Sequence, residues 1–93
     1  MRVEYDLAKS ERNVRERGLC FSRAVDFGFE SAAFIHDARQ DYGEERYIAV
    51  GYLDQRLHVL CFAPNEDGIR VISFRKANRR EAIRYGKPLT TPH

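Results

Sequence analysis

The chain has 93 residues, of which 43% are hydrophobic, 32% charged and 12% aromatic, and its formal net charge is +2. This length suits one compact domain, and no apolar run is longer than a strand, so the composition excludes a multidomain enzyme, a disordered chain and a membrane-spanning protein. Two cysteines, Cys20 and Cys61, suggest neither a zinc site nor a disulfide framework, and the N-terminal region lacks an apolar signal segment. We therefore predict a cytoplasmic protein with reduced thiols and no membrane association.

The first predicted element is a helix over LAKSERNVRER. Asp6 precedes it as an N-cap, and Gly18 follows it as the glycine that ends it. Leu7 and Val14 are expected to face the protein interior. Polar residues spaced by four form a stripe along this helix: Lys9, Asn13 and Arg17. A second, shorter helix is predicted over residues 23–29.

Four runs rich in β-branched and aromatic residues follow, with an apolar period of two. They predict strands over residues 32–36, 46–53, 57–63 and 69–75. The connections between the last three strands are too short for a parallel crossover, so these strands are predicted to be antiparallel. Both faces of the third strand are apolar, which predicts a central position with helices on at least one side of the sheet.

The last predicted element is a helix within ANRREAIRYGK, capped by Asn78 and ended by Gly86. Ile83 is placed where it can dock on the sheet. Residues 88–93 are polar and bracketed by prolines, which predicts a flexible tail beyond a single domain of residues 1–87. The predicted fold is α+β, with two N-terminal helices, a four-stranded antiparallel sheet and a C-terminal helix.

Charge is unevenly distributed along the chain. The last strand and helix carry seven basic residues and one acid, Glu81, whereas the middle of the chain carries seven acids and two arginines. Thirteen of the sixteen cations are arginine, which favours bidentate contacts to phosphate or carboxylate. Arg75 ends a strand beside Lys76, Arg79 and Arg80, so it can form a phosphate clamp. The alternative for Arg75 is a surface salt bridge.

Three stretches carry a family resemblance: VEYDLAKSERNVRERGLCF, YGEERYIAVG and VISFRKANRREAIRY. In order and spacing they resemble the BrnT family of toxins from bacterial type II toxin–antitoxin systems, a RelE-like ribonuclease family. The resemblance implies a RelE-like fold and an endoribonuclease that cleaves RNA with no metal or other cofactor. It also implies a cognate BrnA-like antitoxin, through which alone the toxin would contact operator DNA.

The resemblance also implies site residues. The residues that match family positions are the predicted catalytic set: Lys9, Glu45, Arg46 and Arg75. The predicted RNA-binding residues are cations near them: Arg17, Lys76, Arg79 and Arg80. Arg17 stands where the family usually has histidine, and an arginine cannot act there as a general acid or base.

The placement of these residues leaves alternatives open. Glu45 and Arg46 form either a general base with a phosphate ligand or a pair that only caps a loop. In an antiparallel meander Arg46 and Arg75 are expected to lie roughly 20 Å apart, with Arg70 nearer to Glu45. If the arginines serve only in recognition, the chain is a non-catalytic module that binds nucleic acid or protein. A third possibility is a small structural subunit that assembles with another chain and has no affinity for nucleic acid.

The histidines suggest no sharper mechanism. His36 and His58 fall in predicted strands at no metal-ligand spacing, so no metal site is expected and both are interpreted as structural residues. His93 ends the predicted tail.

Overall fold

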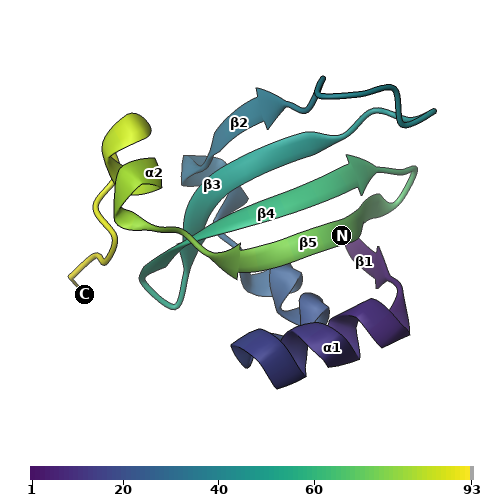
Figure 1. The fold of residues 1–93 in the computed structure, drawn as a ribbon, viewed down its shortest axis with the longest axis horizontal. Coiled ribbons are helices and arrows are strands. Elements are labelled where there is room, and N and C mark those ends of the chain that lie inside the picture. The colour runs from purple at the N-terminus through teal and green to yellow at the C-terminus, as the bar shows by residue number, and fades with distance from the viewer. Residues whose placement is uncertain (93) are drawn as a thin grey trace.

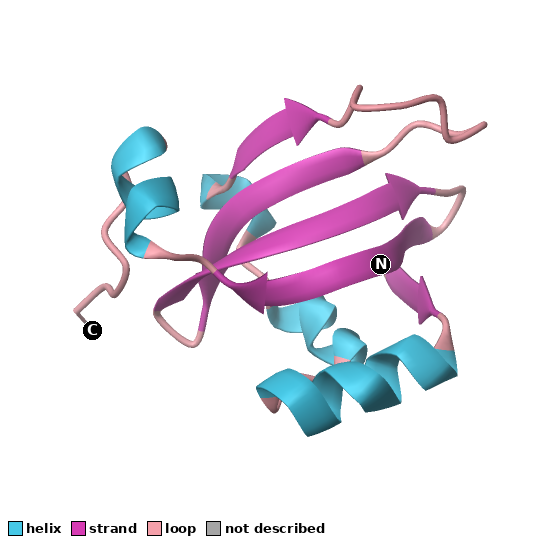
Figure 2. Ribbon diagram, in the orientation of Figure 1, coloured by secondary structure: helices cyan, strands magenta, loops and turns pink. Residues whose placement is uncertain are grey.

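The computed structural model describes residues 1–92, which form a five-stranded sheet with helical segments on both faces (Figure 1). The strands are β1 (Arg2–Tyr5), β2 (Ala33–His36), β3 (Tyr47–Leu53), β4 (Arg56–Pro64) and β5 (Gly68–Lys76). The helical elements are α1 (Leu7–Arg17), η1 (Phe21–Asp26), η2 (Phe29–Ser31) and α2 (Arg79–Arg84). The strand order is β1-β5-β4-β3-β2, and Figure 2 shows α1 beside the sheet and α2 at the end of β5.

The α+β class is confirmed, and the antiparallel arrangement of β2 to β5 is confirmed. The four-stranded sheet is wrong, because β1 adds a fifth strand that runs parallel to β5. Its partner lies more than sixty residues away along the chain, so the local pattern of RVEY gave no sign of the pairing. A Cβ atom at Gly68 would lie 2.1 Å from the carbonyl oxygen of Arg2, so glycine is required where the two strands meet.

The second predicted helix is also wrong, since residues 21–31 form the two 3₁₀ segments η1 and η2 instead. The buried residues of this stretch are spaced by three: Phe21, Ala24 and Phe27. That spacing matches the three residues per turn of a 3₁₀-helix, in which side chains at i and i+3 lie above one another. We therefore attribute the 3₁₀ conformation of η1 to the burial of these three side chains in the core.

The first helix has the predicted bounds and caps. The Asp6 side chain accepts from the backbone N–H of Lys9, and Gly18 ends the helix with a φ of 69°. Its predicted inner face is wrong, because Leu7 is 64% exposed and Val14 46% exposed, while Ser10 is buried. The Ser10 hydroxyl accepts from the backbone N–H of Phe21 at 3.0 Å, so α1 docks through a polar contact.

The core lies on both sides of β4, as its two apolar faces predicted. Leu60 and Phe62 pack with η1 on one face, and Leu57 and Val59 pack with α2 on the other. A bulge between Cys61 and Phe62 shifts the register of β5, so that residues three apart, Val71 and Phe74, point into the same core.

The C-terminal helix is capped by Asn78 as predicted, but Ile83 is 75% exposed and Ala82 is the residue that packs inward. The docking prediction for Ile83 is therefore wrong by one position. The segment after α2 runs back along the sheet, where Leu57 N donates to Leu89 O at 2.8 Å and Thr91 N to Gln55 O at 2.9 Å. The flexibility of this tail stays a prediction. Motion of residues 88–92 would break the two backbone hydrogen bonds to Leu57 and Gln55. His93 lies outside the described residues.

Candidate nucleic-acid interface

The seam between α1 and β5 is built around Asn13. β1 pairs with only the first residues of β5, up to Val71, so the rest of this edge is left to α1. The Asn13 side-chain amide donates to Phe74 O and to Leu19 O, both at 2.9 Å. The predicted polar stripe therefore faces the sheet edge, and Lys9 and Arg17 lie one helical turn to either side of Asn13.

Three hollows follow this seam. The first is a hollow of about 410 Å³ whose lining includes Glu4, Asp6, Lys9, Arg46 and Arg70. The second, of about 220 Å³, includes Lys9, Arg12, Asn13, Glu16, Arg17 and Arg75. The third, of about 460 Å³, includes Arg17, Arg23, Asp54, Arg56, His58 and Lys76. Lys9 is shared by the first two and Arg17 by the last two, so the hollows form one continuous basic track.

Among the described residues, three cations of this basic track have neither a carboxylate partner nor a side-chain hydrogen bond, whereas Arg56 donates to two backbone carbonyls. Within the part of the chain that the structure describes, Lys9, Arg17 and Lys76 form no ion pair. Lys9 and Arg17 lie about 12 Å apart along the axis of α1, since eight residues each add a rise of about 1.5 Å. Free cations along a groove are the arrangement that neutralises successive phosphates of a nucleic-acid backbone.

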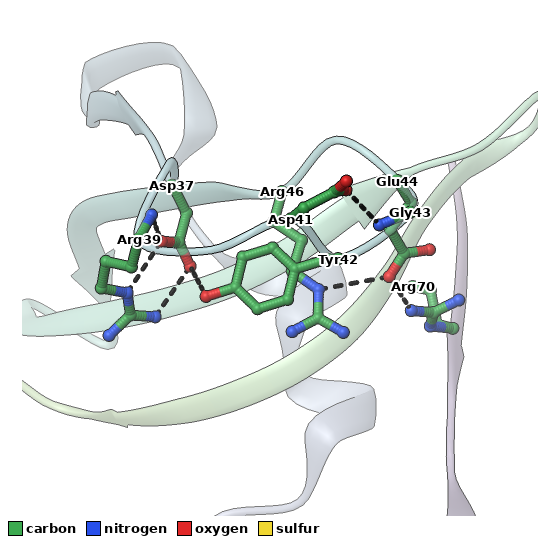
Figure 3. A network of polar contacts seen from close by, with 8 residues as sticks. All are labelled: Asp37, Arg39, Asp41, Tyr42, Gly43, Glu44, Arg46 and Arg70. Atoms are coloured by element: carbon green, nitrogen blue, oxygen red, sulfur yellow. Dashed lines mark hydrogen bonds and ion pairs between the residues drawn. The ribbon is translucent and has the colours of Figure 1, made fainter.

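Arg46 and Arg70 share one carboxylate. Glu44 accepts from Arg46 Nε at 3.2 Å and also pairs with Arg70 Nη2, and the Arg46 guanidinium lies 3.9 Å from the centroid of the Tyr42 ring (Figure 3). Arg70, followed by Arg46, holds the pKa of Glu44 below its ordinary value. Arg46 therefore pairs with a neighbouring charge of its loop, which is one of the two alternatives that the sequence offered. Its role in catalysis stays a prediction.

The loop that carries Glu44 is held at its other end by Asp37. This side chain has no exposed surface and accepts from Arg39 Nε and Nη2, both at 2.7 Å, and from the Tyr42 hydroxyl at 3.2 Å (Figure 3). The hydrogen bonds from Arg39 lower the pKa of Asp37 to about 2. The acidic middle of the sequence thus orders a loop whose Glu44 pairs with two arginines that line the first hollow, Arg46 and Arg70.

Arg75 binds Glu81, so the predicted phosphate clamp is occupied by a carboxylate. Arg75 Nη1 lies 2.9 Å from Glu81 Oε1, and Nη2 lies 2.8 Å from Oε2. Glu81 also accepts from the backbone N–H of Asn78, whose side chain accepts from Glu81 N, which completes a capping box at the start of α2. The structure favours the salt-bridge interpretation of Arg75, and a role in catalysis stays a prediction.

Replacing Glu81 with glutamine is expected to destabilise the protein by about 1–2 kcal/mol at neutral pH, because it removes a half-buried ion pair and weakens the helix cap. Arg75 lowers the pKa of Glu81 from 4.5 to about 2. A carboxyl with a lowered pKa stabilises the fold above pH of about 4.5, and the stabilisation disappears as the pH falls toward 2. Urea unfolding of both proteins at pH 7 and at pH 3 measures this difference.

The matched control is Glu66→Gln, since Glu66 is an exposed acid with no ion pair among the described residues. Its unfolding midpoint should follow the wild type at both pH values. A gap between wild type and Glu81→Gln that stays constant from pH 7 to pH 2.5 would contradict the assignment.

The remaining predicted site residues lie away from the basic track. Glu45 is exposed, accepts from the Tyr47 hydroxyl at 3.1 Å and lines a separate hollow with His36. Arg79 and Arg80 are exposed on α2, as expected, and line none of the three hollows. Of the eight residues predicted for the site, the structure therefore gathers five in these hollows: Lys9, Arg17, Arg46, Arg75 and Lys76.

Sequence reasoning missed His58 as a site residue. Its ring is buried on β4, packs 5.5 Å from the Phe74 ring and lines the third hollow together with Arg17 and Lys76. Only the pairing of β4 with β5 brings His58 opposite Lys76. The available signal was polar character on an apolar central strand, which also fits a structural histidine.

Residues 1–92 contain no group of three or more histidine, cysteine or acidic side chains arranged to hold a metal ion. No helix in the described chain is both long and apolar enough to cross a bilayer.

A small α+β domain with a continuous track of lysine and arginine is typical of proteins that bind a nucleic-acid backbone. The family model described as the ribonuclease toxin, BrnT, of type II toxin–antitoxin systems matches residues 5–81, and the chain belongs to this family. The match confirms the resemblance and supports a toxin role with an antitoxin partner. No curated protein and no solved structure matches the chain.

Proposed function

We propose that this protein is an endoribonuclease toxin that binds RNA along the basic track between α1 and β5. The observation that carries the proposal is the sharing of Lys9 and Arg17 between neighbouring hollows, which joins the cations into one path. A single-stranded backbone that follows this path meets at least one unpaired cation in each hollow, alongside the carboxylates of Glu4, Asp6, Glu16 and Asp54. Family membership supplies independent support for ribonuclease chemistry.

Metal-independent RNA cleavage needs a base for the ribose 2′-hydroxyl, cations for the charge on the phosphate and a proton for the leaving oxygen. Lys9, Arg17 and Lys76 offer cations that need no rearrangement. Arg46 and Arg75 are held by Glu44 and Glu81, so a phosphate must compete with a carboxylate to use them. The three unpaired cations are therefore the first ligands in this proposal.

Arg17→Ala and Lys76→Ala are each expected to weaken RNA binding about tenfold at moderate salt, because each removes a phosphate contact. The slope of log K against log salt should fall by about 0.7 per variant, the value for one phosphate contact to a single strand. Fluorescence anisotropy with a labelled RNA oligonucleotide at several salt concentrations measures both quantities, and gel analysis of the same samples measures cleavage.

Arg15→Ala is the matched control, since Arg15 is an exposed cation of α1 that lines none of the three hollows. It removes the same charge from the same helix and should leave binding and slope unchanged within about twofold. If Arg15→Ala weakens binding as much as Arg17→Ala, the affinity reflects net charge and not the basic track.

Salt-dependent binding that leaves RNA intact would select the alternative, a non-catalytic binding module. The ion pairs of Arg46 and Arg75 are the observation that favours this alternative, because both predicted catalytic arginines are already neutralised. Expression of the toxin alone should slow growth and degrade RNA, whereas absence of both effects would remove the enzymatic part of the proposal.

We further propose that a BrnA-like antitoxin inhibits the protein by covering the basic track, and that operator DNA is bound only through the antitoxin. An acidic segment of the antitoxin laid along Lys9 and Arg17 would exclude phosphate by direct competition. Co-expression with the antitoxin should restore growth, and Arg17→Ala should weaken the complex as well as RNA binding.

A further inference from the structure

The third hollow combines unpaired cations with a histidine. Arg17 comes from the end of α1, Lys76 from the end of β5 and His58 from β4, so three separate elements converge on one site. Its other charged groups are engaged elsewhere. Arg23 binds Asp54 and Asp26, and Arg56 donates to the carbonyls of Leu57 at 2.7 Å and Ala77 at 3.0 Å. Arg17 and Lys76 are thus the cations available to a ligand.

The surroundings of His58 fix its tautomer. Nδ1 lies 2.7 Å from the carbonyl oxygen of Arg56, and a carbonyl only accepts, so Nδ1 carries the hydrogen. Nε2 is then left with a lone pair. Among residues 1–92, Nε2 has no hydrogen-bond partner. Every fully buried side-chain nitrogen or oxygen in the buried residues of this part of the chain does have a partner, so Nε2 is not fully buried. We infer that it remains accessible from the hollow that His58 lines. A neutral ring nitrogen with a free lone pair beside a hollow can act as a Brønsted base.

The environment also keeps the imidazole neutral. Burial, which is the largest influence, lowers the pKa of His58 below its ordinary value of 6.5, and the charges of Arg56 and Lys76 lower it further. The carbonyl of Arg56 and the carboxylate of Asp54 oppose this shift. Arg17 and Arg23 complete the charged groups that line the hollow. At neutral pH the side chain is therefore ready to accept a proton.

We propose that His58 is the general base of RNA cleavage, and that Arg17 and Lys76 hold the scissile phosphate in the third hollow. This assignment rests on the proposed ribonuclease function and names its reacting group. Nε2 takes the proton of a ribose 2′-hydroxyl, the 2′-oxygen forms a bond to the adjacent phosphorus, and the bond from phosphorus to the 5′-oxygen breaks. The leaving oxygen takes a proton from water, and the imidazolium neutralises the hydroxide. The products are a 2′,3′-cyclic phosphate and a 5′-hydroxyl end.

The test is His58→Asn in the full chain, because the asparagine amide can still donate to the Arg56 carbonyl while the base is lost. Cleavage of an RNA oligonucleotide should fall about 10²- to 10⁴-fold, and RNA affinity should change less than about threefold. The wild-type rate should rise with pH through a midpoint below 6.5 and then level off, since the neutral imidazole is the active form. His58→Asn should lose this midpoint, and added imidazole should restore part of the rate.

His36→Asn is the matched control, because His36 lies on edge strand β2 with its ring against Tyr47 and should keep the wild-type rate and pH profile. Glu45→Gln tests the competing base. A wild-type rate and profile in His58→Asn overturns the assignment while the ribonuclease function stands, and a loss of the pH midpoint in Glu45→Gln alone would transfer the role to Glu45. Absence of cleavage by the wild-type protein would instead remove the proposed function.

A measurement without substitution covers the case in which His58→Asn does not fold. NMR titration of the wild-type histidines should give His58 a pKa below 6.5. A 2′-deoxy-substituted oligonucleotide, which cannot be cleaved, should shift the His58 ring resonances and leave those of His36 in place. Unchanged His58 resonances at saturating oligonucleotide would overturn the assignment.

Discussion

Phe74→Ala is expected to destabilise the protein by about 3–5 kcal/mol, the usual cost of truncating a buried aromatic residue. Phe74 has no exposed surface, and its ring lies 6.0 Å from the Phe27 ring and 5.5 Å from the His58 ring. The lost side chain leaves a cavity between the sheet and η1. Because small domains have a total stability of about 5–15 kcal/mol, much of the population should unfold at moderate temperature. Urea unfolding followed by circular dichroism measures the loss.

Phe34→Ala is the matched control, since Phe34 lies on β2 and is 51% exposed. The same chemical truncation should cost only about 1 kcal/mol there, because about half of the residue is already exposed to water. Equal losses for the two variants would show that Phe74 is not a core residue. The complete burial of Phe74 places it in the core of the domain.

Asn13→Ala is expected to cost about 1–3 kcal/mol, because two partly buried carbonyls, those of Leu19 and Phe74, lose their shared donor. The substitution should also weaken RNA binding, although Asn13 carries no charge. Its side chain fixes α1 against β5, and a loosened helix no longer holds Lys9 and Arg17 in line. Thermal unfolding and the anisotropy titration measure the two effects on the same samples.

Val14→Ala serves as the control for Asn13, because the neighbouring side chain is 46% exposed and its loss should change stability by less than about 0.5 kcal/mol. Asn13→Asp separates hydrogen bonding from shape, since a carboxylate cannot donate to either carbonyl. If Asn13→Ala keeps both its stability and its RNA affinity, α1 is held by other contacts and the seam is not organised by this amide.

Local elements of this fold were predictable where a local signal exists. The first helix has the predicted bounds because Asp6 and Gly18 act within one turn of its ends, and Asn78 caps α2 for the same reason. The strands β2 to β5 agree within two residues because runs of β-branched and aromatic residues, bounded by turn-forming residues, mark them. The expected order of the arginines along the sheet also agrees with the structure. Arg70 shares Glu44 with Arg46, whereas Arg75 lies opposite Val59, toward the other end of β5.

Most of the failures share one cause, which is contact between separate segments of the chain. Leu7 and Val14 look like an inner face by composition, but Ser10 and Asn13 make the docking contacts because η1 and β5 offer polar backbone groups. Arg75 is a more local case, since Glu81, the single acid of its segment, lies only six residues further along and pairs with it at the start of α2.

By itself, the sequence determined the α+β class, the caps of both α-helices, the antiparallel strands and the family, because each follows from short-range pattern or from ordered motifs. Only the tertiary structure decided that β1 joins the sheet, which arginines are neutralised, and that His58 faces the same hollow as Arg17 and Lys76. Strand pairing and side-chain burial bring together residues more than sixty positions apart, and the periodicity of a single segment carries no information about such contacts.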